Sequence, residues 1–410
     1  MSWSPPGLDP EVARFLAYNG LLHIGLLGIT DVVLNFYFVS LGYTPENIGM
    51  LQSMPRLGGF LTSLPVGLLA NRIGTRRVVL YSTLGAAITY AMLAGWPSLI
   101  GLSISRFLLG LFYGAIQIAT TPLLIHLSRP ETETHVFAYL NVVSMGTTAL
   151  GSVIGGFLPL AAVHLVLASS EQTPQAYRFA LVIAGALVVL SSLPLLRLRD
   201  PEHGLSPLRS LADQRQSTPW RRLIWLSLPL LVFGFTGGLT FPFYNLFFRT
   251  TFAVSDQTVG TILSLGWVGM ALLPLANPWW EKRYGRAWAI GVAMTVAAAA
   301  FLGLSLASIL ATGVVCYVVA ISFRNMMQPL FQPLIMDALP HDLHNLTSGI
   351  GMVLWNIGWF AATAISGRWQ TEHGFDFIMR VVAAGAFLNG ALIVWVFRRG
   401  TASGPRESAQ

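Results

Sequence analysis

Apolar residues in this chain come in long blocks, separated by short segments that are polar or rich in proline and glycine. A helix needs about 20 mostly apolar residues to cross the hydrocarbon layer of a membrane. Twelve blocks of this kind can be counted along the sequence. They predict an all-α integral membrane protein with twelve transmembrane helices. The predicted helices are centred near Ile29, Leu57, Ala87, Gly110, Leu150, Val188, Gly238, Gly266, Val296, Met326, Ile357 and Phe387.

The longest polar stretch between predicted helices divides the chain nearly in half. It runs from Arg197 to Arg222, directly after the sixth helix. The first apolar block is longer than a signal-peptide core and has no small-residue cleavage site after it, so we expect it to be retained as a span. We therefore predict an N-terminal six-helix half at 1–196, a cytoplasmic linker at 197–221, a C-terminal six-helix half at 222–397 and a cytoplasmic tail at 398–410.

The composition agrees with a membrane protein and disfavours a soluble one. Hydrophobic residues make up 54% of the 410 residues and charged residues 10%, against about 25% charged residues in a typical soluble chain. So few charges cannot cover a globule of this size with a hydrated surface. The net charge is +7, but basic stripes interleaved with polar sequence are missing, which argues against nucleic acid as a partner.

Motifs for enzymatic or ATP-driven activity are missing from the sequence. It contains neither a nucleophile paired with a base nor a His-Glu-x-x-His zinc motif. The only lysine, Lys282, lies outside any phosphate-binding Gly-x-x-x-x-Gly-Lys-Ser/Thr loop. A single cysteine, Cys316, supports neither a disulfide framework nor a thiolate metal cluster. We therefore expect no enzymatic activity, no cofactor and no metal site.

Basic residues are distributed unevenly between alternate loops, and this asymmetry predicts the orientation of the chain. Most of the 24 lie in loops on one side of the predicted membrane. Loops rich in Arg and Lys stay in the cytoplasm, so we predict a multi-pass protein of the inner (cytoplasmic) cell membrane with both termini cytoplasmic. The opposite side carries only Arg178, Arg249, Arg368 and Arg380.

The two halves of the chain share a weak internal repeat. A shift of 211 residues carries the second predicted helix and the loop after it onto the eighth helix and its loop. Two six-helix halves in parallel repeat are one architecture of secondary transporters, which hold their substrate near the membrane midplane. The shift superposes Gly58 on Gly269, Arg72 on Arg283 and Gly74 on Gly285.

The loop after the second helix reads Gly67-Leu68-Leu69-Ala70-Asn71-Arg72-Ile73-Gly74-Thr75-Arg76-Arg77. It resembles the signature loop of the major facilitator superfamily, Gly-x-x-x-Asp-Arg-x-Gly-Arg-Arg. Arg106-x-x-x-Gly110-x-x-x-Gly114 in the fourth helix is similar to a second motif of that family, and the Gly151 to Pro159 stretch resembles a scrambled form of its antiporter motif. The resemblance implies the major facilitator fold, two pseudo-symmetric six-helix halves, and a loop that gates the cytoplasmic side. The expected gating residues are Gly67, Asn71, Arg72, Gly74, Arg76 and Arg77.

Asn71 departs from the family pattern, because it stands where the signature has Asp. An asparagine can still accept hydrogen bonds from a helix N-terminus. It brings no charge, however, to a helix dipole or to Arg72. The sequence therefore predicts a weaker cytoplasmic latch than the family motif implies.

Four ionisable residues lie inside predicted helices at similar depth: Asp31, Arg56, Arg106 and Arg324. Ionised groups at mid-membrane are costly and normally face a cavity or a partner. Asp31 could neutralise Arg56 on the neighbouring helix as a packed ion pair. Alternatively, Asp31 exchanges protons, because alternating access changes the surroundings that decide whether the carboxylate holds a proton. We therefore predict Asp31 as a proton-coupling residue.

Polar side chains near these charges repeat at helical spacing, which predicts a polar stripe on one face of a helix. Examples are His23, Asp31 and Asn35 in the first helix, and Arg324 and Gln328 in the tenth. Pro242 in the seventh helix, just before Tyr244 and Asn245, predicts a kink. The family resemblance implies that helices one, four, seven and ten line the central cavity. The predicted substrate-binding residues are Asn35, Arg106, Tyr113, Gln117, Tyr244, Asn245, Arg324, Gln328, Gln332, Trp355 and Asn356.

These features predict a secondary active transporter that works by alternating access and moves a small anionic or amphipathic solute, with protons as coupling ion. The alternative is a proton-coupled multidrug efflux antiporter for lipophilic or cationic compounds, favoured by Asp31 and the aromatic residues of the eleventh helix. A channel or a non-transporting membrane protein fits the repeat and the signature loop less well. The expected partners are a small-molecule solute, protons and the lipid bilayer, and we expect a monomer.

Overall fold

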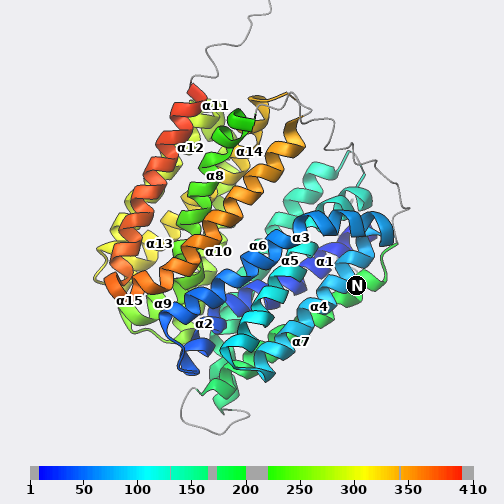
Figure 1. The fold of residues 1–410 in the computed structure, drawn as a ribbon, viewed down its shortest axis with the longest axis vertical. Coiled ribbons are helices and arrows are strands. Elements are labelled where there is room, and N and C mark those ends of the chain that lie inside the picture. Colours follow the sequence, from blue (N-terminus) through cyan, green and yellow to red (C-terminus); the bar gives the residue numbers. More distant parts are fainter. Residues whose placement is uncertain (1–8, 130, 165–172, 200–219, 341–342, 399–410) are drawn as a thin grey trace, which may run out of the picture. The chain divides into compact units, whose positions relative to one another are not determined.

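The computed structural model describes residues 9–129, 131–164, 173–199, 220–340 and 343–398 (Figure 1). Every regular element within these ranges is a helix. In the first part of the chain these are α1 (Pro10–His23), η1 (Ile24–Ile29), α2 (Thr30–Ser40), α3 (Pro45–Ile73), α4 (Thr75–Gly95), α5 (Leu99–Leu127), α6 (Glu133–Ala162) and α7 (Pro174–Leu196). The later elements are α8 (Trp220–Thr240), η3 (Phe241–Phe243), α9 (Tyr244–Phe252), α10 (Asp256–Leu272), η4 (Leu273–Ala276), α11 (Asn277–Tyr284), α12 (Arg286–Ser305), α13 (Leu310–Asn325), α14 (Met327–Asp337) and α15 (His344–Arg398).

The all-helical membrane fold is confirmed, but the count of twelve spans is not. Ten stretches of the described chain are long and apolar enough to cross a membrane. The predicted eleventh and twelfth helices both lie within one of these stretches, in α15, but the backbone at Gly374 is not helical (φ 75° and ψ 174°), so a kink separates two helices there. The predicted second helix, α3, is not among the ten.

By packing, the chain groups into two compact units. Unit 1 comprises residues 1–213 and 242–268, and unit 2 comprises 214–241 and 269–410. Residues 242–268, which include η3 from Pro242 onward, α9 and most of α10, therefore pack with the first six predicted helices. The boundaries expected from the linker stay a prediction.

The first predicted helix is not a regular α-helix throughout. A π-helical segment, η1, separates α1 from α2, and the hydroxyl of Thr30 donates to the carbonyl of Gly25 at 2.8 Å, five residues earlier. Here α6 crosses so closely that a Cβ on Gly28 would lie 2.5 Å from the Cα of Gly151. Single π turns inside helices are frequent at functional sites, and this one ends just before Asp31.

The predicted kink at Pro242 is confirmed. The seventh predicted helix ends as α8 at Thr240, passes through the three-residue 3-10 turn η3 and resumes as α9. Proline causes such breaks because it has no N–H to donate and its ring clashes with the preceding turn. The tenth predicted helix is also divided, at Met326, into α13 and α14.

The internal repeat reappears in local backbone conformation. Gly74 has φ 93° and ψ 145°, and Gly285 has φ 75° and ψ 157°. Each amide donates to the carbonyl four residues earlier, and each glycine immediately precedes the next helix. A positive φ of this kind favours glycine, so the signature loop and its counterpart end in the same turn.

Within the signature loop, Arg76 holds the end of α7. Its Nε and NH2 donate to the carbonyls of Leu195 and Leu196, both at 2.8 Å. Arg72 is exposed. The side-chain positions of Gly67 and Asn71 lie outside the described part of the structure, so the predicted effect of Asn71 on the latch stays a prediction.

Candidate functional site

Charged side chains of unit 1 gather between α2, α3 and α5. The Asp31 carboxylate interacts electrostatically with Arg106 and with Arg56. Arg56 also interacts with Tyr113. Three of the four charges predicted at mid-membrane therefore form one cluster, together with the predicted Tyr113. With all three ionised, the cluster has a positive excess.

Arg106 is the most deeply placed cation of this cluster, with 8% of its surface exposed. Its NH2 donates to Oε1 of Gln52 on α3 at 2.6 Å. Its Nε is buried and has no hydrogen-bond partner among the described residues. A buried donor without a partner is costly. This guanidinium can therefore donate a further hydrogen bond, to an anionic group or another acceptor.

A chain of amide side chains continues from Gln52. The Nε2 of Gln52 donates to Oδ1 of Asn35 at 2.6 Å. The Nδ2 of Asn35 donates to Oδ1 of Asn245 at 2.8 Å and to the carbonyl of Pro242 at 2.6 Å. Two predicted substrate-binding residues, Asn35 and Asn245, therefore meet, and their amides hold η3 and α9 against α2.

Asn245 completes the attachment of α9. Its Nδ2 donates to the carbonyls of Asp31 and Val32, at 2.9 and 3.0 Å. These carbonyls belong to the first turn of α2, directly after the π-helical segment. The neighbouring predicted residue Tyr244 is buried, whereas Gln117 on α5 is exposed.

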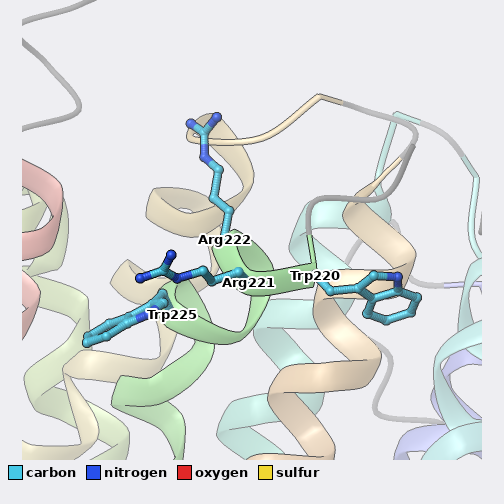
Figure 2. Close-up of a pocket in the computed structure, with 4 residues that line it drawn as sticks. All are labelled: Trp220, Arg221, Arg222 and Trp225. Carbon is cyan, nitrogen blue, oxygen red and sulfur yellow. The ribbon is translucent and has the colours of Figure 1, made fainter. Parts of the chain in front are cut away.

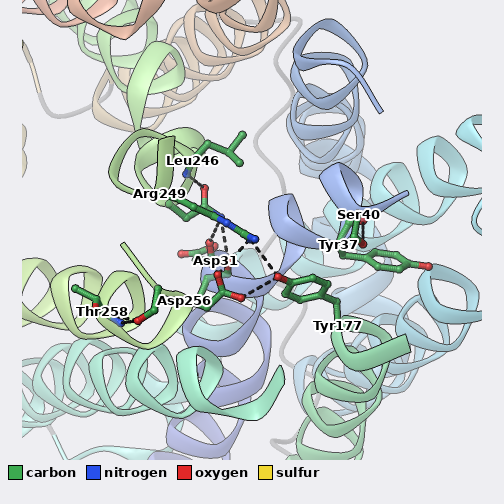
Figure 3. A network of polar contacts seen from close by, with 11 residues as sticks. Asp31, Tyr37, Ser40, Tyr177, Leu246, Arg249, Asp256 and Thr258 are labelled. Atoms are coloured by element: carbon green, nitrogen blue, oxygen red, sulfur yellow. Dashed lines mark hydrogen bonds and ion pairs between the residues drawn. The ribbon is translucent and has the colours of Figure 1, made fainter. Parts of the chain in front are cut away.

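A second polar group binds α9 and α10 to α7 (Figure 3). The Asp256 carboxylate faces NH1 of Arg249 at 3.2 Å and accepts the hydroxyl hydrogen of Tyr177 at 2.8 Å. NH1 of Arg249 also donates to the Tyr177 hydroxyl at 3.1 Å. The Arg249 guanidinium lies 4.4 Å from the ring centroid of Phe36 on α2. The three polar residues form a closed triangle.

Backbone packing beside this triangle is tight. A Cβ on Gly156 of α6 would lie 2.7 Å from the carbonyl oxygen of Asp256. A Cβ on Gly260 of α10 would lie 2.4 Å from the carbonyl oxygen of Ser152. Small residues allow such close helix crossings, so α10 is held to unit 1 by both packing and charge.

Arg324 is the predicted binding residue of unit 2 that carries a charge. This arginine is 8% exposed, its NH2 donates to the carbonyl of Phe233 on α8, and its guanidinium lies 3.8 Å from the Phe233 ring centroid. A Cβ on Gly237 would lie 2.6 Å from that NH2. These contacts bind Arg324 to α8, so a role in solute binding stays a prediction.

Trp355 and Trp359 lie on α15 and also face α8. Their ring centroids are 5.4 Å apart at 64°, and Trp359 is 5.8 Å from the ring of Phe241. Trp359 is buried and Trp355 is half-buried. The remaining predicted residues of this unit are the half-buried Asn356 and the exposed Gln328 and Gln332.

A surface hollow of about 530 Å³ lies at the start of α8 (Figure 2). It is lined by Trp220, Arg221, Arg222 and Trp225. Both tryptophans are nearly half exposed. Trp and Arg at the start of a span are typical of a membrane boundary.

Sequence reasoning missed Gln52 and the Tyr177, Arg249 and Asp256 triangle. Gln52 lies four residues before Arg56, so helical spacing alone could have flagged it. In the triangle, Tyr177 contacts Arg249 and Asp256, which lie 72 and 79 residues further along the chain. A periodic pattern in a single sequence cannot predict contacts between residues so far apart.

Comparisons with known proteins agree with this fold. The chain is 26% identical over 286 residues to the class E tetracycline resistance protein of Escherichia coli, covering 68% of each chain. It is 22% identical over 265 residues to the quinolone resistance protein NorA of Staphylococcus aureus, covering 64% of this chain and 65% of NorA. A bacterial homologue of the human lysosomal transporter Spinster, solved in an inward-facing and occupied conformation, superposes with a TM-score of 0.76 at 15% identity, covering 96% of this chain and 98% of that one.

The family model of the Major Facilitator Superfamily matches residues 16–363 and, in an overlapping match, 226–410. These matches cover most of the chain, including the charged cluster of unit 1 and both polar attachments of α9. Proteins of this family are multi-pass membrane transporters of small solutes rather than enzymes. The resemblance predicted from the signature loop is confirmed, and the chain belongs to the Major Facilitator Superfamily.

Proposed function

We propose that this transporter moves a small solute that carries an anionic group, by alternating access. The observation that supports this proposal is the buried guanidinium of Arg106, which has an unused Nε donor. Arg56 adds a second positive charge, and Asp31 is the carboxylate that interacts with both. A carboxylate or phosphate on the solute would balance the positive excess and fill the open donor position.

Asp31 is the proposed proton-coupling residue. It interacts with Arg106, so a solute anion at Arg106 and the Asp31 carboxylate compete for the same positive charge. A competition of this kind links solute binding to protonation of Asp31, because the carboxylate that loses its cation holds a proton more readily. Solute and proton would therefore move in a fixed ratio.

A second candidate function is proton-coupled export of lipophilic cations. The relatives named as tetracycline and quinolone resistance proteins and the paired rings of Trp355 and Trp359 favour it. Cations are attracted to the faces of aromatic rings. In such an exporter Asp31 would be essential, whereas Arg106 would oppose substrate binding.

The purified transporter in proteoliposomes with an imposed pH gradient separates these functions. We expect labelled mono- and dicarboxylates or phosphorylated metabolites to accumulate, and hydrophobic cations such as ethidium not to. Arg106→Gln should reduce uptake by at least about tenfold, because it removes a charged hydrogen-bond donor. Arg380→Gln is the matched control, since the same change occurs at an exposed arginine of α15.

Asp31→Asn distinguishes coupling from binding. We expect it to abolish accumulation driven by the pH gradient while counterflow of solute between the two sides of the membrane continues. Cation export that survives Arg106→Gln and is lost in Asp31→Asn would establish the second function instead. Accumulation of neither class under a pH gradient would overturn both.

A further inference from the structure

Four side chains connect the cluster at Arg106 to the attachment of α9. Arg106 lies on α5, Gln52 on α3, Asn35 on α2 and Asn245 on α9. The successive hydrogen bonds are 2.6, 2.6 and 2.8 Å long. Asn35 is fully buried, and Asn245 and Arg106 are 2% and 8% exposed. Gln52 is half-buried, so the other three side chains of this chain are shielded from bulk water and Gln52 is shielded in part.

The amides of Asn35 and Asn245 have a fixed orientation, because both hydrogens and the oxygen of each take part in hydrogen bonds. Asn35 gives one Nδ2 hydrogen to Pro242 and the other to Asn245, and its Oδ1 accepts from Gln52. Asn245 gives its hydrogens to the carbonyls of Asp31 and Val32, and its Oδ1 accepts from Asn35 and from the Leu246 amide. An amide side chain has two donors and one oxygen, so flipping any member would oppose donor to donor or oxygen to oxygen.

The orientation of the whole chain is dictated at its first member. Arginine can only donate, so Gln52 must turn its oxygen toward Arg106 and its NH2 toward Asn35. Asn35 must then turn its oxygen toward Gln52 and its NH2 toward α9. If the hydrogen of Arg106 is taken by another acceptor, Gln52 loses the partner that determines its orientation. Hydrogen-bond chains of this kind act together rather than as independent pairs.

We infer that Gln52 and Asn35 are positioning residues that transmit the hydrogen-bonding state of the Arg106 guanidinium to the attachment of α9. Arg106 donates to Gln52 in the structure, and α9 is held to α2. When a solute anion binds Nε and NH2 of Arg106 together, it takes the NH2 hydrogen that Gln52 now accepts. Gln52 is then released, and the hold of Asn35 on Pro242 and Asn245 weakens. The solute step rests on the proposed function. The connection from Arg106 to α9 does not rest on the proposed function, because these hydrogen bonds are present in the protein without solute.

Hydrogen exchange of residues 241–252, measured by mass spectrometry on the purified full-length protein without solute, tests this connection. Local opening of a segment exposes its amides to exchange. Gln52→Leu should raise the exchange rate of this segment by at least about threefold, since a buried hydrogen bond contributes about 1 kcal/mol. Gln175→Leu is the matched control, because the same change is made at an exposed position of α7 in the same unit and should leave the segment unchanged.

The decisive measurement is the dependence of one substitution on the other. Arg106→Leu should raise the exchange rate of 241–252 in the natural chain but have no further effect when Gln52 is already Leu. Residues that act through a shared partner show this non-additivity, and independent ones do not. Equal effects of Arg106→Leu in both backgrounds, or an unchanged rate in Gln52→Leu, would overturn the inference.

Gln52→Glu keeps the test informative if Gln52→Leu fails to fold. Glutamate still accepts from Arg106, but as a carboxylate it has no hydrogen to give to Asn35. We expect faster exchange of 241–252 with the rest of unit 1 unchanged, and an unchanged rate would again contradict the connection. Since the readout needs no solute, a failure to find transport of anions would overturn the proposed function and leave this result intact.

Discussion

Arg249 and Asp256 face each other at 3.2 Å but differ in their contact with solvent. The Arg249 side chain is 35% exposed and also rests on the Phe36 ring, whereas the Asp256 side chain is 2% exposed. Removing one partner of a buried ion pair is destabilising mainly because the other charge is left without compensation. The two single substitutions should therefore have unequal effects.

Arg249→Gln should destabilise the purified protein by about 3 kcal/mol, since it leaves a buried carboxylate with only Tyr177 as a close donor. Asp256→Asn should have a smaller effect, about 1 kcal/mol, because Arg249 keeps water, Tyr177 and the Phe36 ring. The double variant should be more stable than Arg249→Gln alone. Thermal unfolding in detergent, followed by circular dichroism, measures all three.

The control for this pair is Glu372→Gln. Glu372 also pairs with an arginine, Arg368, at 2.6 Å, but both side chains are exposed. Exposed pairs contribute about 0.5 kcal/mol, so the unfolding temperature should hardly change. If Arg249→Gln and Glu372→Gln had equal effects, the Asp256 carboxylate would not depend on Arg249 for its burial.

At the level of residues, the sequence indicated which side chains belong to the candidate site better than it indicated which side chains they contact. Charges inside apolar helices are rare, and this rarity alone picked out Asp31, Arg56 and Arg106, which the structure brings together. Asn35 and Asn245 were also picked out, but their contact across 210 positions follows from tertiary packing. Gln52 was overlooked because a single glutamine in a helix is common.

Among the elements, the crossing of η1 and α6 sets the position of Asp31. A Cβ on Gly151 would lie 2.5 Å from the carbonyl oxygen of Ile24 and 2.9 Å from the Cα of Gly28. Backbone atoms cannot move aside as a flexible side chain can. The close crossing therefore depends on glycine at Gly151, and it supports the π-helical turn that precedes Asp31.

Gly151→Ala should consequently destabilise the protein by about 2 kcal/mol, the range found for overpacking, and lower the yield of folded protein. Gly146→Ala on the same helix is the matched control, since among the described residues nothing lies within 4 Å of the position of its Cβ. Alanine favours helix over glycine by up to about 1 kcal/mol, so this control should be neutral or stabilising. Equal destabilisation by both substitutions would show that the crossing is less tight than the structure indicates. Unfolding midpoints in detergent provide the comparison.

Element boundaries were predictable where a residue imposes them. Pro242 predicted the break between α8 and α9 because proline cannot donate within a helix. The π turn at Ile24–Ile29 had no such marker. It arises where two glycine-bearing helices cross, and regular helical spacing placed His23 and Asp31 on one stripe without allowing for the extra turn.

On the scale of the whole molecule, hydropathy and the repeat carried the prediction furthest. Apolar blocks are a consequence of lipid as the solvent of the helices. They can therefore be recognised in the sequence without knowing any tertiary contact. The repeat was confirmed in detail at Gly74 and Gly285, which share an unusual positive φ. The packing of residues 242–268 with unit 1 was not predictable, because it depends on contacts between distant segments rather than on local pattern.

The distribution of arginines makes a prediction for the whole molecule, because it places the loop near Glu372 outside the cell and the loop near Tyr284 inside. Both side chains are exposed, and the single natural cysteine can be removed as Cys316→Ser. In that background, Glu372→Cys should react with a membrane-impermeant maleimide in intact cells. Tyr284→Cys should react only after the membrane is permeabilised.

Loops rich in Arg and Lys are retained in the cytoplasm during insertion, and Lys282 and Arg283 beside Tyr284 follow that rule. Labelling of Tyr284→Cys in intact cells, with protection of Glu372→Cys, would invert the orientation. The attachment of α9 and α10 by Arg249 and Asp256 would then lie at the cytoplasmic end, and the signature loop with Arg76 would lie outside. The labelling pattern therefore decides on which side of the membrane the Arg249–Asp256 pair lies and on which side the contact of Arg76 with α7 lies.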